Sequence, residues 1–243
     1  RFMANSPARM KPDYGYEFVD LEVDDDAEYP VTVTLRHTAG PAEGTERTVR
    51  AKYVVGCDGA RSKVRQSIGS TLAGDAANHA WGVMDVLAST DFPDIRTKCA
   101  IQSSNGGSIL HIPREGGHLF RMYVDLGEVP EGDNGAVRKT SIDEIIAKAN
   151  AILHPYTLDV RNVAWHSVYE VGHRLTDRFD DVLPEQVGKR TPRVFITGDA
   201  CHTHSAKAGQ GMNVSMQDGF NIAWKLGHVL DGRAPESLLS TYS

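Results

Sequence analysis

The sequence predicts a mixed α/β protein, because strand-like and helix-like segments follow each other in an order that fits neither an all-α nor an all-β class. Two observations carry this prediction. Residues 16–126 are dominated by alternating and β-branched segments, whereas the last third holds a short apolar strand, a glycine-rich loop and a long helical pattern. With 243 residues, the chain can form one large domain or two interleaved ones.

Charge and composition exclude several classes of function. Against 26 Lys and Arg stand 32 Asp and Glu, a formal net charge of -6, which argues against binding nucleic acid or an anionic membrane. No apolar run approaches the roughly 18 residues that a membrane span needs. Three widely spaced cysteines do not suggest a disulfide framework, so a reduced, cytoplasmic protein is expected.

The N-terminal third predicts a β-meander. Residues 16–24 alternate between apolar and acidic side chains, and residues 31–35 continue as a strand after an acidic break. A turn-rich segment at residues 39–44 leads into a further strand over residues 49–55.

The middle of the chain predicts more strands and one helix. Strands are expected at residues 81–86, 109–112, 119–124 and 160–169, with turns at 106–107 and 115–117. Ser141 and Glu144 have the spacing of a capping box. The helix that follows carries one apolar stripe, formed by Ile142, Ile145, Ile146, Ala149, Ile152 and Leu153.

The last third predicts a short buried strand at residues 194–197 and then a long helix. Five apolar residues recur in it at helical spacing: Met212, Met216, Ala223, Leu226 and Leu230. Asp231 and Gly232 are expected to form the C-cap that ends this helix.

Two segments carry the features of a ligand site. In residues 53–65 a β-branched strand runs into Asp58-Gly59 and then a helix, and α/β sheets bind ligands at the carboxyl ends of their strands. In residues 194–213 a strand ends in Gly198-Asp199, and two further glycines open a helix whose N–H groups can meet an electron-rich group. The plainer alternatives are an Asp58 that only caps its helix and a tight turn before the long helix.

These segments resemble two of the three fingerprints of the FAD-dependent aromatic hydroxylases, in the branch of phenol 2-monooxygenase and 3-hydroxybenzoate 4-monooxygenase. The resemblance rests on Asp58-Gly59 with Ser62 and Arg65, on residues 198–213, and on residues 112–123. The family's Gly-x-Gly-x-x-Gly unit is absent, as is the branch's C-terminal thioredoxin-like domain, and the chain begins Arg1-Phe2-Met3. An internal fragment is therefore expected.

The resemblance implies a fold, a reaction and cofactors. Residues 1–75 and 186–243 are expected to form the distal half of an FAD-binding, Rossmann-like domain, interleaved with a β-sheet substrate-binding domain at residues 76–185. The parent protein is expected to hydroxylate a small phenolic aromatic, phenol or a hydroxybenzoate, in aromatic compound catabolism. It would use FAD, NADPH or NADH, and O2 through a C4a-hydroperoxyflavin, as a homodimer. The isolated chain is expected to be inactive and largely free of flavin.

Residue roles carried over from the family are as follows. Asp199 would hold ribityl or ribose hydroxyls, and Asp58 would organise backbone N–H groups and Arg65 near the pyrophosphates. The flavin ring would be lined by Gly209, Gln210, Gly211, Met212 and Asn213, with Tyr123 also near the cofactor.

The resemblance also implies that Tyr123 and Arg114 match substrate-pocket positions of this branch, which makes them the candidate catalytic residues. A hydroxyl can bind a phenolic oxygen, and a cation favours the phenolate. Lys98 is the candidate for a substrate carboxylate. The plainer alternatives are an ordinary strand residue for Tyr123, a surface ion pair for Arg114 and a solvated Lys98.

A competing reading is a metal-dependent hydrolase. Four residues of metal-ligand type fall close together: Asp199, Cys201, His202 and His204. Structural zinc sites pair two short clusters, and the chain has no second Cys/His pair with ligand spacing, so no metal is expected.

Overall fold

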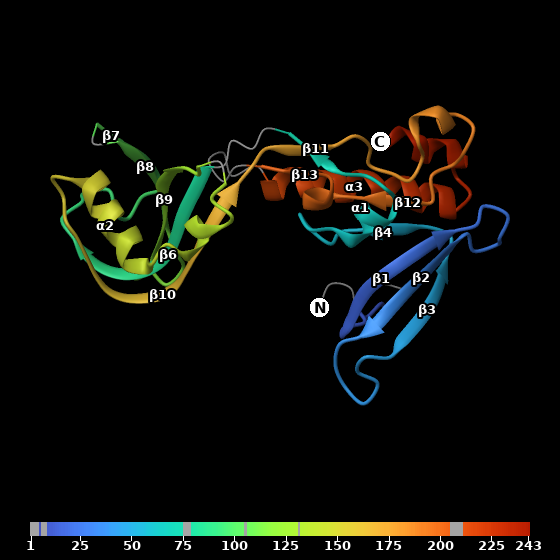
Figure 1. Cartoon of the computed structure of the whole chain (residues 1–243), viewed down its shortest axis with the longest axis horizontal. Helices are drawn as coiled ribbons and strands as arrows, with labels where there is room; N and C mark the ends of the chain where they lie inside the picture. The colour runs from blue at the N-terminus through green and yellow to red at the C-terminus, as the bar shows by residue number, and fades with distance from the viewer. Residues whose placement is uncertain (1–4, 6–8, 75–78, 105, 131, 205–210) are drawn as a thin grey trace. The chain divides into compact units, whose positions relative to one another are not determined.

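The computed structural model describes residue 5 and residues 9–74, 79–104, 106–130, 132–204 and 211–243, and it divides the chain into two compact units (Figure 1). Unit 1 consists of Arg1–Ala73, Leu175–Thr203 and Gly211–Ser243. Unit 2 consists of Gly74–Arg174 and His204–Gln210. The mixed α/β class that the sequence predicts is confirmed.

The first sheet of unit 1 is the predicted meander. Strands β1 (Tyr16–Val23), β2 (Val31–His37) and β3 (Glu46–Ala51) pair antiparallel in the order β1-β2-β3 (Figure 1). Val31 and Val33 on the central strand are buried, and they pack in one cluster with Val64 and Ile196.

A two-stranded parallel sheet forms the centre of unit 1. Strand β4 (Val54–Gly56) pairs with β12 (Val194–Ile196), so that Val54 lies opposite Val194 and Gly56 opposite Ile196. The prediction of one strand over residues 49–55 was wrong, because the chain leaves the meander after Ala51 and enters this second sheet at Val54.

Helices α1 (Lys63–Ser67) and α3 (Gly211–Leu230) complete unit 1, with a small sheet ordered β13 (His202–Thr203), β11 (Arg174–Thr176) and β5 (Leu72–Ala73). Helix α3 was predicted, and Gly232 ends it with φ +70°. Its buried side faces Phe195, Leu239 and Tyr242 through Ile222, whereas Met212 and Met216 are exposed. Helical spacing alone therefore located the helix but not its buried face.

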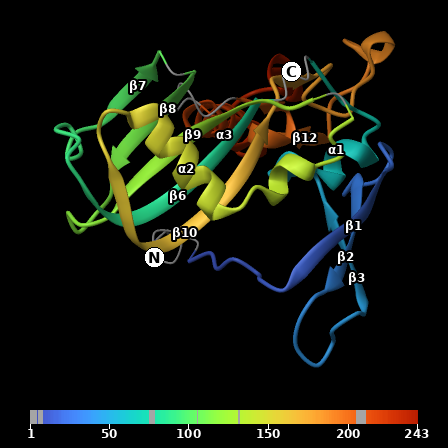
Figure 2. The same ribbon diagram turned by 60° about the vertical axis from the view of Figure 1, so that its left-hand side comes forward.

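Unit 2 is a five-stranded antiparallel sheet with one helix on it. The strand order is β10 (Leu158–Val171), β6 (His79–Thr90), β9 (Phe120–Glu128), β8 (Gly107–Pro113) and β7 (Cys99–Ser103). Helix α2 (Ile142–Leu153) covers one face, as Figures 1 and 2 show. Strand β7 was not predicted.

The predicted capping box and apolar stripe of α2 are confirmed. The Ser141 side chain accepts a hydrogen bond from the Glu144 backbone, and the Glu144 carboxylate accepts one from the Ser141 backbone. Ile145, Ala149 and Ile152 then pack against the buried side chains of the sheet.

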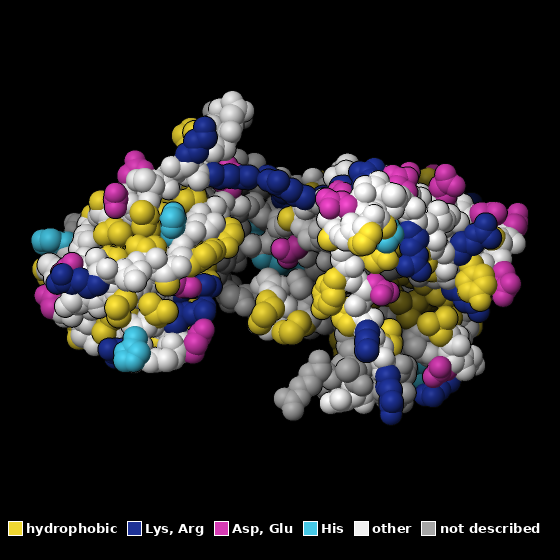
Figure 3. Space-filling model, turned by 90° about the horizontal axis from the view of Figure 1, so that it is seen from below, with side chains coloured by type: hydrophobic (Ala, Val, Ile, Leu, Met, Phe, Trp, Pro, Cys, Tyr) yellow, Lys and Arg dark blue, Asp and Glu magenta, His cyan; other side chains and the backbone are white. Residues whose placement is uncertain are grey.

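Short 3₁₀ turns connect these elements, at η2 (Ala136–Lys139), η3 (Pro184–Gln186), η4 (Gly198–Ala200) and η6 (Glu236–Thr241). In the part of the chain that is described, no helix is both long enough and apolar enough to cross a membrane. Acidic and basic side chains are interspersed on the surface seen in Figure 3.

Candidate functional site

The two segments singled out in the sequence meet in unit 1. Because β4 and β12 run parallel and in register, Asp58 and Asp199 both follow the carboxyl end of this pair, two and three residues after Gly56 and Ile196. The Thr197 backbone N–H donates to the Gly56 carbonyl at 3.0 Å, which continues the pairing one residue beyond the end of β12. This edge is where parallel α/β sheets bind ligands.

Asp58 organises the start of helix α1. Its Oδ2 accepts hydrogen bonds from the backbone N–H groups of Lys63, at 2.8 Å, and Val64, at 3.1 Å. Its Oδ1 accepts one from the Ser62 hydroxyl, whose oxygen in turn accepts from the Arg65 backbone at 2.9 Å. The carboxylate therefore already occupies the first two N–H groups of this helix, although the N-cap residue is Ser62 and not Asp58.

Glycine at position 56 permits close packing of strand and helix. A Cβ there would lie 2.7 Å from the Cβ of Val64, a distance that real side chains do not reach. Since Val64 is buried, the helix could not move away without opening the core.

Arg65 joins the two segments. Its Nη1 donates to the Ala200 carbonyl at 3.0 Å, and its Nη2 donates to the Ala60 carbonyl at 2.9 Å. The side chain is buried, and this burial lowers its pKa from the usual value.

Gly198 and Asp199 form a tight turn held by helix α3. Gly198 has φ +63°, and a Cβ at this position would lie 3.0 Å from the Ser215 side chain on α3. Asp218, also on α3, accepts from the Gly198 N–H at 3.2 Å and pairs with His202 Nε2 at 2.6 Å. Asp199 itself is exposed. Asp199 is thus the exposed residue of this turn, whereas the Gly198 N–H and the His202 ring are both bound by Asp218.

The remaining predicted cofactor residues lie at the start of α3. Gly209 and Gln210 lie outside the described residues. Gly211, Met212 and Asn213 form the first turn of the helix, which contains no acidic residue. An acid-free first turn leaves the positive end of the helix dipole available to an electron-rich group.

The residues of the competing metal site are arranged differently from a ligand cluster. His202 pairs with Asp218, and Cys201 is fully buried, which raises the pKa of its thiol. Among the described residues, no three His, Cys, Asp or Glu side chains lie together as metal ligands would.

In unit 2, Tyr123 lies on the face of the sheet opposite to α2. Gly82 faces Ile145 of α2, and side chains alternate along each strand, so Trp81, Val83 and Tyr123 point the other way. Tyr123 lies directly opposite Val83 on β6 and Leu110 on β8.

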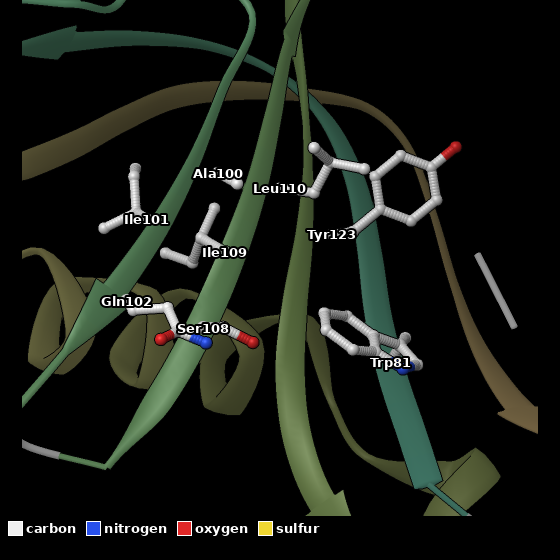
Figure 4. Close-up of a pocket in the computed structure, with 8 residues that line it drawn as sticks. All are labelled: Trp81, Ala100, Ile101, Gln102, Ser108, Ile109, Leu110 and Tyr123. Carbon is white, nitrogen blue, oxygen red and sulfur yellow. The ribbon is translucent and has the colours of Figure 1, made fainter. Parts of the chain in front are cut away.

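A pocket of about 190 Å³ opens on unit 2. It is lined by Trp81, Ala100, Ile101, Gln102, Ser108, Ile109, Leu110 and Tyr123. Figure 4 shows the rings of Trp81 and Tyr123 beside the side chain of Leu110. An engineered cavity of roughly 150 Å³ holds benzene, so this volume suits a single aromatic ring.

Sequence reasoning missed an ion pair next to Tyr123. The Arg121 Nε and Nη2 atoms donate to the two carboxylate oxygens of Asp85, both at 2.7 Å. The Arg121 guanidinium also lies over the ring of Trp165, 5.2 Å from its centroid. The signal was present as an Arg-x-Tyr spacing, which puts both side chains on one face of a strand.

Each partner of this pair stabilises the charge of the other. The hydrogen bond to Arg121 is the main cause that lowers the pKa of Asp85, and Arg114 adds to it. The hydrogen bond to Asp85 is likewise the main cause that raises the pKa of Arg121.

The other two predicted substrate residues lie outside the described pocket. Arg114 follows β8 and pairs with exposed Glu115 at 2.9 Å, as the surface alternative expects, although it also acts on Asp85. Lys98 is exposed and directly precedes β7, whose Ala100 and Gln102 line the pocket.

The sequence pattern of the family described as FAD binding domain matches residues 5–243. The chain belongs to this family. It is 54% identical over 244 residues to the 3-hydroxybenzoate 4-monooxygenase of Comamonas testosteroni, covering 99% of this chain and 38% of that protein. It is 42% identical over 228 residues to the phenol 2-monooxygenase fsqG of Aspergillus fumigatus, covering 90% of this chain and 35% of that protein.

Solved structures of this FAD-binding family share the fold. The anhydrotetracycline hydroxylase OxyS of Streptomyces rimosus superposes with a TM-score of 0.70 at 27% identity, over 95% of this chain and 41% of that one. The aromatic hydroxylase CabE gives a TM-score of 0.62, also at 27% identity. The chain thus spans well under half the length of each of these four relatives.

Two features of unit 1 have the chemistry to meet parts of an FAD. Exposed Asp199 can accept hydrogen bonds from hydroxyl groups, and the acid-free first turn of α3 can face a ring that gains negative charge. Asp58, by contrast, already binds the N–H groups that open α1, so its carboxylate holds the start of this helix in place.

Proposed function

We propose that the whole protein that contains this chain is an FAD-dependent aromatic-ring monooxygenase that hydroxylates a small phenolic compound with NADPH or NADH and O2. The observation that carries the proposal is the parallel pairing of β4 and β12, because it sets the Gly198-Asp199 turn at the carboxyl end of a parallel sheet. The family membership and the similarity to two aromatic monooxygenases support it.

When bound, FAD would supply the redox chemistry. This chain's own residues would bind and orient. Asp199 would hold sugar hydroxyls of the cofactor, and the turn of Gly211, Met212 and Asn213 would face the electron-rich part of its ring.

The substrate would bind on the face of unit 2 that carries Tyr123. The pocket volume favours a single ring, and the rings of Trp81 and Tyr123 with Leu110 offer an apolar surface to it. The Tyr123 hydroxyl would bind the phenolic oxygen, and the nearby Arg121 would favour the phenolate form, which is the better nucleophile. Arg114, which follows β8 and pairs with exposed Glu115, stays a second candidate for this role.

The experiment is to purify the whole protein, record its absorbance spectrum and metal content, and assay NADPH oxidation with phenol and with 3-hydroxybenzoate. A yellow protein that couples NADPH oxidation to a dihydroxylated product is expected. Asp199→Ala should weaken FAD binding, whereas Tyr123→Phe should retain FAD and lose turnover. Asp159→Asn, on an exposed ion pair of β10, serves as the control.

A colourless protein that contains a stoichiometric metal would contradict the proposal and favour the hydrolase. A flavin-containing protein without coupled turnover of any phenol would reject the substrate class. The predicted homodimer and cytoplasmic location stay predictions, which size determination and cell fractionation can test.

A further inference from the structure

We propose that Ser108 accepts a hydrogen bond from a second hydroxyl group on the aromatic ring of the substrate, and that Asp125 is the positioning residue that holds Ser108 in this role. The inference rests on the proposed function and narrows it to one class of substrate, aromatic rings with two hydroxyl groups on non-adjacent carbons. It assigns a role to two residues that the sequence analysis did not identify.

The first step is the position of Ser108 in the pocket. Ser108 on β8 lies directly opposite Gln102 on β7, and both residues line the pocket. Tyr123 lies opposite Leu110, which is two residues further along β8, about 7 Å in an extended strand. Figure 4 shows Ser108 and Gln102 away from the ring of Tyr123. The pocket therefore has hydrogen-bonding groups at two separate places, which suits a ring with polar substituents on non-adjacent carbons.

The second step is the contact that orients Ser108. Its hydroxyl donates to the Oδ2 atom of Asp125 at 3.0 Å. The Oδ1 atom of the same carboxylate accepts from the Gly127 N–H at 2.9 Å and pairs with the Nε2 atom of His79. Only 13% of the Asp125 side chain is exposed, so water competes little for these bonds. The carboxylate is therefore fixed by partners on three strands, β6, β8 and β9.

The third step is the charge of Asp125. Burial acts to raise its pKa, but the hydrogen bonds from Gly127, His79 and Ser108 outweigh burial, so that the pKa is lowered. An ionised carboxylate has no proton and can only accept hydrogen bonds. The Ser108 hydroxyl therefore donates its single proton to Asp125, and its oxygen can only accept a further hydrogen bond.

An acceptor at this place distinguishes substituents by their hydrogen bonding. A substrate hydroxyl can donate to the Ser108 oxygen, whereas a carboxylate has only lone pairs to offer it. A polar group that is buried without a partner is costly, so a mismatched substituent is disfavoured there. Lys98, the candidate for a carboxylate, directly precedes β7, whereas Gln102 lies near the end of that strand. A hydroxyl and a carboxylate would thus be bound at different ends of β7.

The experiment measures ligand binding to the whole protein by calorimetry, without NADPH or NADH. The ligands are phenol, 1,3-dihydroxybenzene and 1,4-dihydroxybenzene. At least one dihydroxybenzene should bind about twofold to tenfold more tightly than phenol, the range expected for one net hydrogen bond. Ser108→Ala should remove this advantage and leave the Kd of phenol unchanged, whereas Ser108→Thr, which keeps a hydroxyl, should retain it. If neither dihydroxybenzene binds more tightly than phenol, or if the advantage survives in Ser108→Ala, the proposal is overturned.

A second variant tests the positioning role of Asp125. In Asp125→Asn the side-chain amide can donate to the Ser108 oxygen, which frees the Ser108 proton to point into the pocket. The advantage of the dihydroxybenzene over phenol should therefore shrink, while the Kd of 3-hydroxybenzoate should not rise, because a carboxylate gains a donor. Equal weakening of all ligands would indicate a purely structural role and overturn the assignment of Asp125. If Asp125→Asn does not fold, Ser108→Ala still decides the proposal, because it leaves Asp125 its bonds to His79 and Gly127.

A matched control and the choice of readout complete the test. Ser89→Ala removes an exposed hydroxyl from β6 and should change none of these affinities. Because binding is measured without turnover, the two proposals can fail separately. A protein with a Ser108-dependent preference that hydroxylates no phenol would reject the proposed function alone. A protein that hydroxylates phenol but binds all three ligands equally would overturn this inference alone.

Discussion

The Arg65 Nη1 atom donates a hydrogen bond to the Ala200 carbonyl oxygen at 3.0 Å, across 135 residues of sequence. This bond ties the helix after Asp58-Gly59 to the turn after Gly198-Asp199. Together with the pairing of β4 and β12, it makes the two segments one structural element. The pairing of β4 and β12 brings both turns to the same end of the sheet, and the Arg65 hydrogen bond holds α1 next to the turn at Ala200.

Replacing Arg65 with Met should therefore lower the stability of the whole protein and its affinity for FAD together. The change leaves the carbonyl oxygen of buried Ala200 without this donor, and a buried group left unpaired costs about 1–3 kcal/mol. The melting temperature should fall by a few degrees, measured by thermal unfolding. Arg61→Met, at an exposed position of the same segment, should change it little. Equal effects of the two variants would contradict the linking role.

Local signals made part of this structure predictable. Ser141 and Glu144 lie three residues apart and cap α2 as predicted, because a capping box needs only neighbouring residues. The strand at residues 194–196 was likewise predictable from a short apolar run before Gly198-Asp199.

Features that depend on distant strands were not predictable in the same way. Val54 and Val55 look like a continuation of the preceding strand, and only pairing with β12 moves them into another sheet. The sequence analysis indicated Arg114 as the pocket cation and did not identify Arg121. The ion pair of Arg121 depends on Asp85, 36 residues before it, which the register of β6 and β9 places opposite it.

Gly198 should not tolerate alanine. Its φ of +63° is a left-handed conformation that L residues rarely adopt, and the added Cβ would lie 3.0 Å from Ser215. Such backbone strain costs about 1–3 kcal/mol, so Gly198→Ala should lower the melting temperature and weaken FAD binding, because Asp199 follows directly in the turn. Gly232→Ala, with φ +70° but open space around its Cβ, is the matched control. Gly232→Ala should lower the melting temperature yet retain affinity for FAD. If Gly232→Ala also weakened FAD binding, backbone strain alone would explain the loss of stability and of affinity in Gly198→Ala.

The Asp85–Arg121 pair should give the protein an acid-dependent component of stability. The pKa of Asp85 is lowered in the folded state, chiefly by Arg121. Its contribution is therefore present above the unfolded value of about 3.9 and is lost as the pH falls through the folded value. The melting temperature of Asp85→Asn should fall less steeply than that of the wild type as the pH is lowered from about 5 to 3. Asp159→Asn, which removes half of an exposed pair, should follow the wild type, and a parallel curve for Asp85→Asn would contradict the assignment.

Lys98 provides a test of the substrate carboxylate. It is exposed and directly precedes β7, which contributes Ala100 and Gln102 to the pocket, so a carboxylate at the pocket edge could reach it. Exposed ion pairs contribute about 0–1 kcal/mol, so Lys98→Met in the whole protein should raise KM for 3-hydroxybenzoate by up to about fivefold. KM for phenol should hardly change, because phenol offers no carboxylate. The difference between the two substrates should shrink at high salt, since exposed charges are screened. Lys139→Met, also exposed in unit 2, should affect neither substrate, and equal effects of Lys98→Met on both would reject the carboxylate role.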